Sequence, residues 1–119
     1  MSSSPETATY CLYDLTVSVI GRPDTFVCDH SPGVAFRVVG EDLVWVQPRF
    51  SQYALVALAP LLPAKQRETA REDWMTSDMD VACPDPNCGA RFHIERDGQT
   101  TFERAKATRV PLPQGDSAP

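Results

Sequence analysis

The sequence predicts an α+β fold, in which a small antiparallel sheet, made of a meander and a C-terminal hairpin, packs on one central hydrophobic helix. Three observations favour this class. The first half of the chain alternates apolar and polar residues as strands do, and a short stretch near the end does the same. Between them lies a segment with helical periodicity that is apolar almost all round. Strands, then a helix, then a hairpin are typical of an α+β domain.

The meander is predicted from three runs. Residues 13–21, YDLTVSVIG, alternate Leu15, Val17 and Val19 with polar residues, which is the period-2 pattern of a strand with one buried face. A loop over residues 22–33 then leads into a second strand, VAFRVVG. The GED that follows is a good turn, and LVWVQ is the third strand, which returns beside the second.

The helix is predicted over Phe50–Leu62. One face carries apolar residues at helical spacing: Phe50, Tyr53, Ala54, Ala57, Leu58 and Leu61. Other apolar residues cover much of the remaining circumference, so we expect this helix to be buried against the sheet. Pro60 removes an amide within the helix and predicts a kink or an early stop, and Pro63 is expected to end it. Residues 64–73, AKQRETARED, have no apolar stripe and predict a solvated helix or loop.

The C-terminal hairpin is predicted from DVAC and ARFHIER, with DPNCG as the turn between them. In the last strand, Phe92 and Ile94 alternate with His93, so we expect His93 on the solvent face. With 119 residues and 42% hydrophobic content, the chain is long enough for one domain, which we place at residues 10–109. Residues 1–9 and 110–119 have little to bury and are predicted to be disordered.

Charge and cysteine usage limit the function classes. The net charge of −5 argues against binding to nucleic acid or to an anionic membrane, since both need a basic surface. The N-terminus has no signal-peptide pattern, and no apolar run approaches the length of a membrane span, so we expect a cytoplasmic protein. In that compartment the four cysteines are reduced thiols, and each is a core residue, a ligand or a nucleophile.

Several segments together resemble a family of short bacterial and archaeal conserved-hypothetical proteins whose activity is uncharacterised. They are VCDHSPGVAFRV, FSQYALVALAPLL, DWMTSDMDV, and ACPDP followed by FHIER. The resemblance covers Leu15 to Arg96, and its most specific part is the Ala-Cys-Pro-Asp-Pro turn with the Phe-x-Ile-Glu-Arg strand. It implies the fold and a single domain, but no activity. In the family a Cys-Pro pair commonly precedes the central helix, whereas here Gln47 replaces that cysteine and Cys88 is an extra one.

The stretch CPDPNCG has two interpretations. The one we prefer is a metal-free β-turn in which Pro84, Pro86 and Gly89 fix the backbone and Asp85 accepts hydrogen bonds from nearby amides. Zinc is the alternative. It would use Cys83 and Cys88, whose C-x4-C spacing is typical of zinc ligands, together with the C-x-H pair Cys28 and His30 in the first loop. No other cofactor is expected. On either interpretation, the resemblance predicts that Cys28 and Cys83 lie close together.

Catalysis is a further alternative, with Cys28, His30, Cys83 and Asp85 as the candidate residues. Cys28 stands two residues from His30, and Cys83 two from Asp85, so a base or a carboxylate is near each thiol. Cys28 is the better nucleophile of the two, because Asp85 would disfavour a thiolate at Cys83.

Acid–base chemistry without a nucleophile is also open. It would use a pair among Asp78, Asp80 and Asp85 in a pocket beside Trp74 and Tyr53.

We therefore expect a small soluble accessory or ligand-binding protein. Motifs that would identify an enzyme, such as a Gly-rich phosphate loop, GxSxG or HExxH, do not occur in the sequence. Two alternatives stay open: a small cofactor-independent enzyme with a pocket between the central helix and the Cys28 and Cys83 loops, and a zinc-stapled interaction module. The sequence specifies neither a small-molecule nor a protein partner, and it leaves oligomer formation open.

Overall fold

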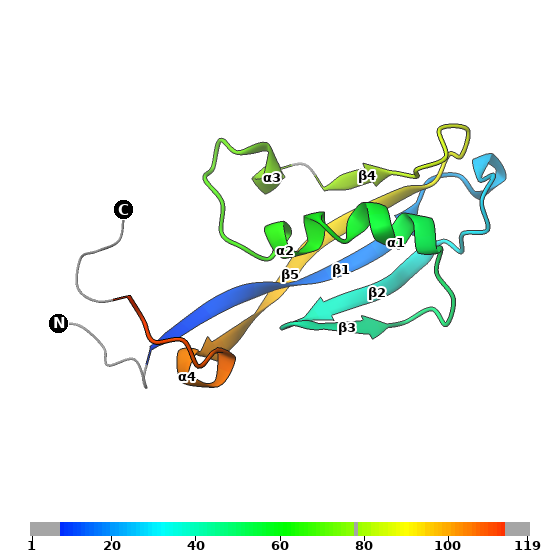
Figure 1. Cartoon of the computed structure of the whole chain (residues 1–119). Helices are drawn as coiled ribbons and strands as arrows, with labels where there is room; N and C mark the ends of the chain where they lie inside the picture. Colours follow the sequence, from blue (N-terminus) through cyan, green and yellow to red (C-terminus); the bar gives the residue numbers. More distant parts are fainter. Residues whose placement is uncertain (1–7, 78, 114–119) are drawn as a thin grey trace.

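The protein has an α+β fold built on one five-stranded antiparallel sheet (Figure 1). The computed structural model describes residues 8–77 and 79–113. The strands are β1 (Thr9–Ile20), β2 (Gly33–Val39), β3 (Asp42–Trp45), β4 (Asp80–Ala82) and β5 (Arg91–Glu103). The helices are η2 (Pro23–Thr25), α1 (Gln52–Leu58), α2 (Leu61–Lys65), α3 (Trp74–Ser77) and α4 (Arg104–Ala107).

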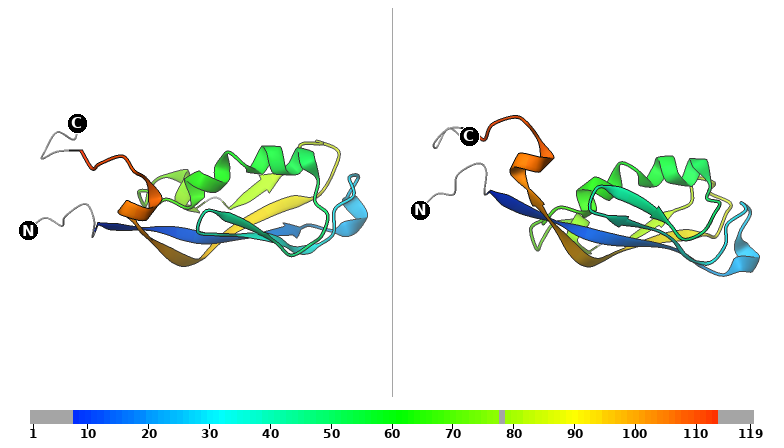
Figure 2. Two further views of the ribbon diagram at one scale, coloured as in Figure 1. Left: turned by 60° about the horizontal axis from the view of Figure 1, so that its bottom comes forward. Right: turned by 90° about the horizontal axis from the view of Figure 1, so that it is seen from below.

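The strand order is β3-β2-β1-β5-β4, and every neighbouring pair is antiparallel. This order confirms the predicted meander (β1 to β3) and the predicted C-terminal hairpin (β4 and β5). β1 and β5 are longer than expected, and beyond the rest of the sheet they continue as a two-stranded ribbon toward the chain termini (Figures 1 and 2). In this ribbon the rings of Tyr10 and Phe102 stack with their centroids 5.3 Å apart.

The hydrophobic core lies between one face of the sheet and helices α1 and α2, which cover that face (Figure 2). Apolar residues of β1, β2 and β5 face the helices at alternate positions, as the period-2 pattern predicts. The buried cluster is Leu15, Val17, Val19, Ala35, Phe36, Val38, Ala54, Leu58, Leu62, Cys83, Cys88, Ala90, Phe92 and Ile94. Two of the four cysteines therefore belong to the core.

The prediction of one central helix over Phe50–Leu62 needs correction. Ser51 caps α1, and this helix ends at Leu58 because the chain reaches Pro60, which opens α2. Pro63 does not end the helical segment, because it lies in the first turn of α2, where a helix needs no amide donor.

Only one side of α1 is buried. Ala54 and Leu58 are inside, but Tyr53 is 78% exposed and Val56 66% exposed. A single layer of helix on a sheet covers one face only, so the outer side of an apolar helix stays in solvent.

Residues 64–73 are also less solvated than expected, since Lys65 is only 2% exposed and Gln66 is buried. The Lys65 ammonium donates to the carbonyl of Met75 (2.6 Å). The Gln66 amide donates to the carbonyls of Gly40 (2.6 Å) and Tyr13 (3.2 Å). These bonds fasten the end of α2 to α3, to β1 and to the β2–β3 turn. The sequence signal was weak because the hydrogen-bond partners lie far away along the chain.

The domain boundaries stay a prediction, since residues 1–7 and 114–119 of the two tails lie outside the described part of the chain. β1 begins at Thr9, which pairs with Glu103, so regular structure starts one residue before the predicted boundary. Within the described ranges, no helix has the length and apolar character needed to cross a bilayer.

Candidate metal centre

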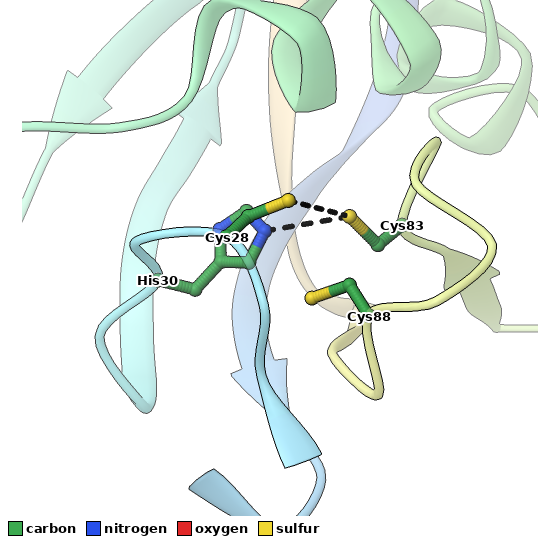
Figure 3. A group of neighbouring side chains, drawn as sticks. All are labelled: Cys28, His30, Cys83 and Cys88. Atoms are coloured by element: carbon green, nitrogen blue, oxygen red, sulfur yellow. Dashed lines mark hydrogen bonds between the residues drawn. The ribbon is translucent and has the colours of Figure 1, made fainter. Parts of the chain in front are cut away.

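Two loops meet at one end of the sheet and bring the zinc candidates together. Cys28 and His30 lie between β1 and β2, and Cys83 and Cys88 lie between β4 and β5. Because Ile20, the last residue of β1, pairs with Arg91, the first residue of β5, both loops leave the sheet at the same place. Figure 3 shows the four side chains pointing toward one another from these two loops.

The four donor atoms form a compact group, all within 4.8 Å of one another. The Sγ atoms of Cys28 and Cys83 are 3.8 Å apart, and the Sγ of Cys83 is 3.5 Å from the Nε2 of His30 (Figure 3). With Zn–S bonds of about 2.3 Å and Zn–N bonds of about 2.0 Å, a tetrahedral site separates two sulfurs by about 3.8 Å and a sulfur from a nitrogen by about 3.5 Å. These two distances therefore fit the edges of a tetrahedral zinc site, and the predicted proximity of Cys28 and Cys83 is confirmed.

The cysteines are free thiols, Cys11 on the surface and the other three in the group. A separation of 3.8 Å between the Cys28 and Cys83 sulfurs is far longer than a disulfide bond of about 2.05 Å. The three thiols and the imidazole could hold a metal ion.

Backbone contacts hold the two loops together. The Gly89 amide donates to the carbonyl of Thr25 (2.8 Å), and the Val27 amide donates to the Sγ of Cys88 (3.3 Å). Gly89 is required here by close approach, since a Cβ at this position would lie 2.0 Å from the Oγ1 of Thr25. Thus Gly89, the residue after Cys88, contacts the loop that carries Cys28 and His30.

The CPDPNCG stretch forms the predicted turn. The Asn87 amide donates to the Oδ1 of Asp85 (2.9 Å), and the Cys88 amide donates to the main-chain oxygen of Asp85 (3.0 Å). The expected acceptor role of Asp85 is therefore confirmed. The Cys83 amide donates to the carbonyl of Ala90 (3.3 Å) and closes the turn. This turn directs both of its thiols to the same side, so a well-formed turn and a metal site are compatible and need not be alternatives.

The His30 ring is held between two aromatic rings. Its centroid lies 5.2 Å from that of Phe92 and 6.2 Å from that of Phe26, and both contacts are edge-on. Burial lowers the pKa of His30 below its ordinary value, although the neighbouring charge of Asp29 opposes the shift. The imidazole is therefore neutral at pH 7, which is the form that binds metals.

The thiols differ in acidity. Burial raises the pKa of Cys28 to about 12, and the hydrogen bond and charge of Cys83 act in the same direction. Burial also opposes ionisation of Cys88, but hydrogen bonds from the amides of Cys28, Ala90 and Val27 outweigh it and lower the pKa of Cys88 to about 7. The lowered pKa favours a thiolate at Cys88. Amide donors around a cysteine sulfur also suit a metal-bound thiolate, because they share its negative charge.

The catalytic roles considered for these residues stay predictions. A nucleophilic thiol needs a lowered pKa, and that of Cys28 is raised. Asp85 contacts the group directly, since its Oδ2 lies 3.7 Å from the Sγ of Cys28, with the thiol as donor.

Of the carboxylates considered for acid–base chemistry, Asp80 and Asp85 contact different groups. Asp80 of β4 pairs with His93 of β5 (2.6 Å), and His93, which we expected on the solvent face, is half-buried. Trp74 and Tyr53, the proposed pocket walls, are both exposed. Asp78 lies outside the described residues.

Residues that support the site were missed from the sequence. Phe26 and Phe92 position the His30 ring, and Thr25 and Gly89 lock the loops together. Gln47, at the position where the resembled family has a cysteine, donates to the carbonyl of Ser31 (2.9 Å), next to His30. None of these residues stands in a recognisable motif, because each acts through a contact that only the folded chain creates.

Comparison with known proteins gives no match to a family model, to a curated protein or to a solved structure. The resemblance to short bacterial and archaeal proteins therefore stays a prediction.

Proposed function

We propose that Cys28, His30, Cys83 and Cys88 bind one Zn²⁺ ion and that the protein is a zinc-stapled interaction module of the cytoplasm. The observation that carries this proposal is the approach of four donor atoms, from two separate loops, to within 4.8 Å of one another. Chance proximity of two thiols is common in a core. The convergence of three thiols and an imidazole is typical of a metal site.

The donor set favours zinc over other common ions. Thiolate and imidazole are soft or borderline ligands, which suit Zn²⁺, whereas Mg²⁺ and Ca²⁺ prefer oxygen. Zinc has no geometric preference of its own and accepts the tetrahedral spacing that the two measured edges fit.

A structural role suits this site better than a catalytic one. Three cysteines and one histidine complete a four-coordinate shell, whereas catalytic zinc keeps a position for water or substrate. The ion would link residues 28–30 to residues 83–88 and so join loops that have little regular structure of their own. Because such a site does not exist in the unfolded chain, the free energy of zinc binding would add to the free energy of folding.

An interaction role follows from a closed metal site beside a small sheet. A structural ion performs no chemistry, and the surface keeps several large apolar side chains in solvent. The reducing cytoplasm would keep the cysteines available as ligands. The enzyme alternative would need one of the same thiols as a nucleophile, a role that a closed zinc shell would block.

Titration with Co²⁺, a visible stand-in for Zn²⁺, tests the proposal. We expect saturation at one equivalent, with the d–d absorption of a tetrahedral ion and thiolate-to-metal charge transfer, followed by displacement by zinc. Loss of a residue outside the first coordination shell typically costs 10- to 100-fold in metal affinity, so Cys88→Ser should lose at least about 100-fold. Cys11→Ser is the matched control, since Cys11 is an exposed thiol outside the group.

Two results would contradict the proposal. One is a Co²⁺ spectrum without charge transfer or with octahedral intensity. The other is an equal loss of affinity in Cys88→Ser and Cys11→Ser.

A further inference from the structure

We propose that two copies of this chain associate by antiparallel pairing of their β3 strands. This inference rests on the proposed role as an interaction module and names its partner, but it does not depend on the zinc ion. β3 is an edge of the sheet (Figure 1). All four of its residues are exposed. Natural proteins protect edge strands by making them short, charged or covered. The opposite edge, β4, has three residues and begins with Asp80, whereas β3 continues from Asp42 into an apolar run.

The backbone of β3 has groups free to pair. The amide of Val46 donates inward, to the carbonyl of Ala35 in β2. Because alternate residues of an antiparallel strand bond to the same neighbour, Val44 also bonds to β2, while Leu43 and Trp45 direct their amides and carbonyls outward. These outward groups are the template for a further strand.

The side chains along this edge are apolar on both faces. Leu43 and Trp45 lie on the helix side, opposite the buried Val38 and Phe36, and are 44% and 46% exposed. The ring of Trp45 also packs on Phe36, with the centroids 4.9 Å apart. Leu43 opens onto a groove of about 250 Å³ between β3 and the helices, whose apolar walls are Val38, Leu43, Leu55, Ala59, Leu62 and Pro63. A strand added to β3 would cover the mouth of this groove.

Charge favours a second copy, and antiparallel pairing in particular. The exposed segment begins with Glu41 and Asp42 and ends with Arg49. None of the ion pairs found among residues 8–77 and 79–113 uses these three side chains. Antiparallel pairing of two copies brings the acidic start of each segment near the basic end of the other, and with Val44 on the axis Glu41 lies opposite Gln47, two residues from Arg49. Parallel pairing would place like charges together.

The register follows from the outward groups. With the two-fold axis at Val44, Leu43 of each copy pairs with Trp45 of the other, which forms four backbone hydrogen bonds. A register centred on Trp45 would need the Gln47 amide, which already donates to Ala35. A register centred on Leu43 would need Glu41, which lies in the β2–β3 turn. In the favoured register the two Val44 side chains face each other, with their Cβ atoms about 4.5–5.5 Å apart.

Sedimentation velocity over about 5 to 500 µM protein, in a thiol reductant that prevents disulfides through Cys11, tests this pairing. An interface of one short strand per copy lies at the low end of specific interfaces, so we expect a dissociation constant in the micromolar range. Val44→Lys and Val44→Glu should each be monomeric, because each puts like charges opposite one another at the axis. An equimolar mixture of the two should recover the dimer, because a lysine then faces a glutamate.

Several outcomes would overturn the proposal. They are a wild-type monomer at 500 µM, a dimer that persists unchanged in Val44→Lys, and a mixture that stays monomeric while both variants are folded by circular dichroism. If either Val44 variant fails to fold, a second pair of variants, in which the charges of Glu41 and Arg49 are reversed, tests the pairing instead. Glu41→Arg and Arg49→Glu should each weaken the dimer, and the double variant should restore it. Additive weakening in the double variant would refute the pairing. Metal content is measured on the same samples after incubation with excess zinc, so a metal-free protein that dimerises contradicts only the zinc proposal, and a zinc-loaded protein that stays monomeric contradicts only the pairing.

Discussion

Substitution of Gly89 by alanine tests how the two ligand loops are joined. A Cβ at this position would lie 2.0 Å from the Oγ1 and 2.5 Å from the Cβ of Thr25, and real Cβ contacts below 3.0 Å essentially never occur. A change of Thr25 rotamer can remove the first contact but not the second. The backbone of one loop must therefore move by about half an ångström or more.

The expected cost of Gly89→Ala follows from this overlap. Overpacking a well-packed site typically lowers the free energy of unfolding by about 1–3 kcal/mol. Because only movement of the backbone can relieve this contact, we expect a loss in the upper part of that range, about 2–3 kcal/mol. The movement would also separate Cys88 from the loop that carries Cys28, so zinc affinity should fall by about 10- to 100-fold. Urea unfolding at saturating zinc and competition with a chromophoric chelator measure the two effects.

Thr25→Gly provides the matched rescue, because it removes both of the overlapping atoms and leaves only the Thr25 carbonyl, at 3.2 Å. Thr25→Gly alone loses the hydrogen bond from Oγ1 to the carbonyl of Arg22. We expect the double variant with Gly89→Ala to be at least about 1 kcal/mol more stable than the sum of the single effects, which is the coupling expected of residues in contact. Additive costs within about 0.5 kcal/mol, or a Gly89→Ala protein as stable as the parent, would refute the close packing of the loops.

Two further predictions concern the sheet. Leu58→Ala should lower the free energy of unfolding by about 2–5 kcal/mol, because Leu58 is fully buried. Tyr53→Ala, on the exposed side of α1, should change the free energy of unfolding by less than about 0.5 kcal/mol. Equal effects of the two substitutions would mean that α1 does not pack as described. Burial opposes ionisation of Asp97, but hydrogen bonds from Thr16 and Arg37 outweigh it and lower the pKa of this carboxyl. The stability that the carboxylate contributes is therefore present above its unfolded pKa of about 3.9. It is lost as pH falls through the lower folded pKa. Arg37→Met should therefore be destabilised relative to the parent at pH 6, by up to about 1 kcal/mol because the pair is partly exposed, and the difference should shrink toward pH 3; a difference independent of pH would contradict the assignment.

Local patterns predicted most of the fold. Alternation predicted β1 and β5, because one buried face imposes period 2 directly on the sequence, and turn signals placed the strands beside them. The extensions of β1 and β5 were missed, since each is paired only with the other and buries little. The helix was predicted at the right place but as one piece. Its division at Pro60 confirms the kink or early stop predicted there. The exposure of Val56 was not predicted, because periodicity does not report how much of the helix the sheet covers.

The four residues of the candidate site were predicted from the sequence, but a metal-free turn was preferred over a zinc site. The spacing of Cys83 and Cys88, together with Cys28 and His30, named the four residues whose donor atoms converge. Their convergence depends on the pairing of β1 with β5, a long-range contact with no local signal. Cys28 and His30 are separated by one residue, and the chain at this loop places the donor atoms of both near the Sγ of Cys83.

Native mass spectrometry of the intact protein, purified without chelator and under reducing conditions, tests the zinc proposal most directly. It measures bound metal and oligomeric state in one spectrum. We predict one zinc ion per chain in the wild type and in Cys11→Ser, and its loss in Cys88→Ser under the same conditions. A metal-free wild-type mass after incubation with excess zinc, or zinc retained at full occupancy in Cys88→Ser, would contradict the assignment of Cys28, His30, Cys83 and Cys88 as a zinc site.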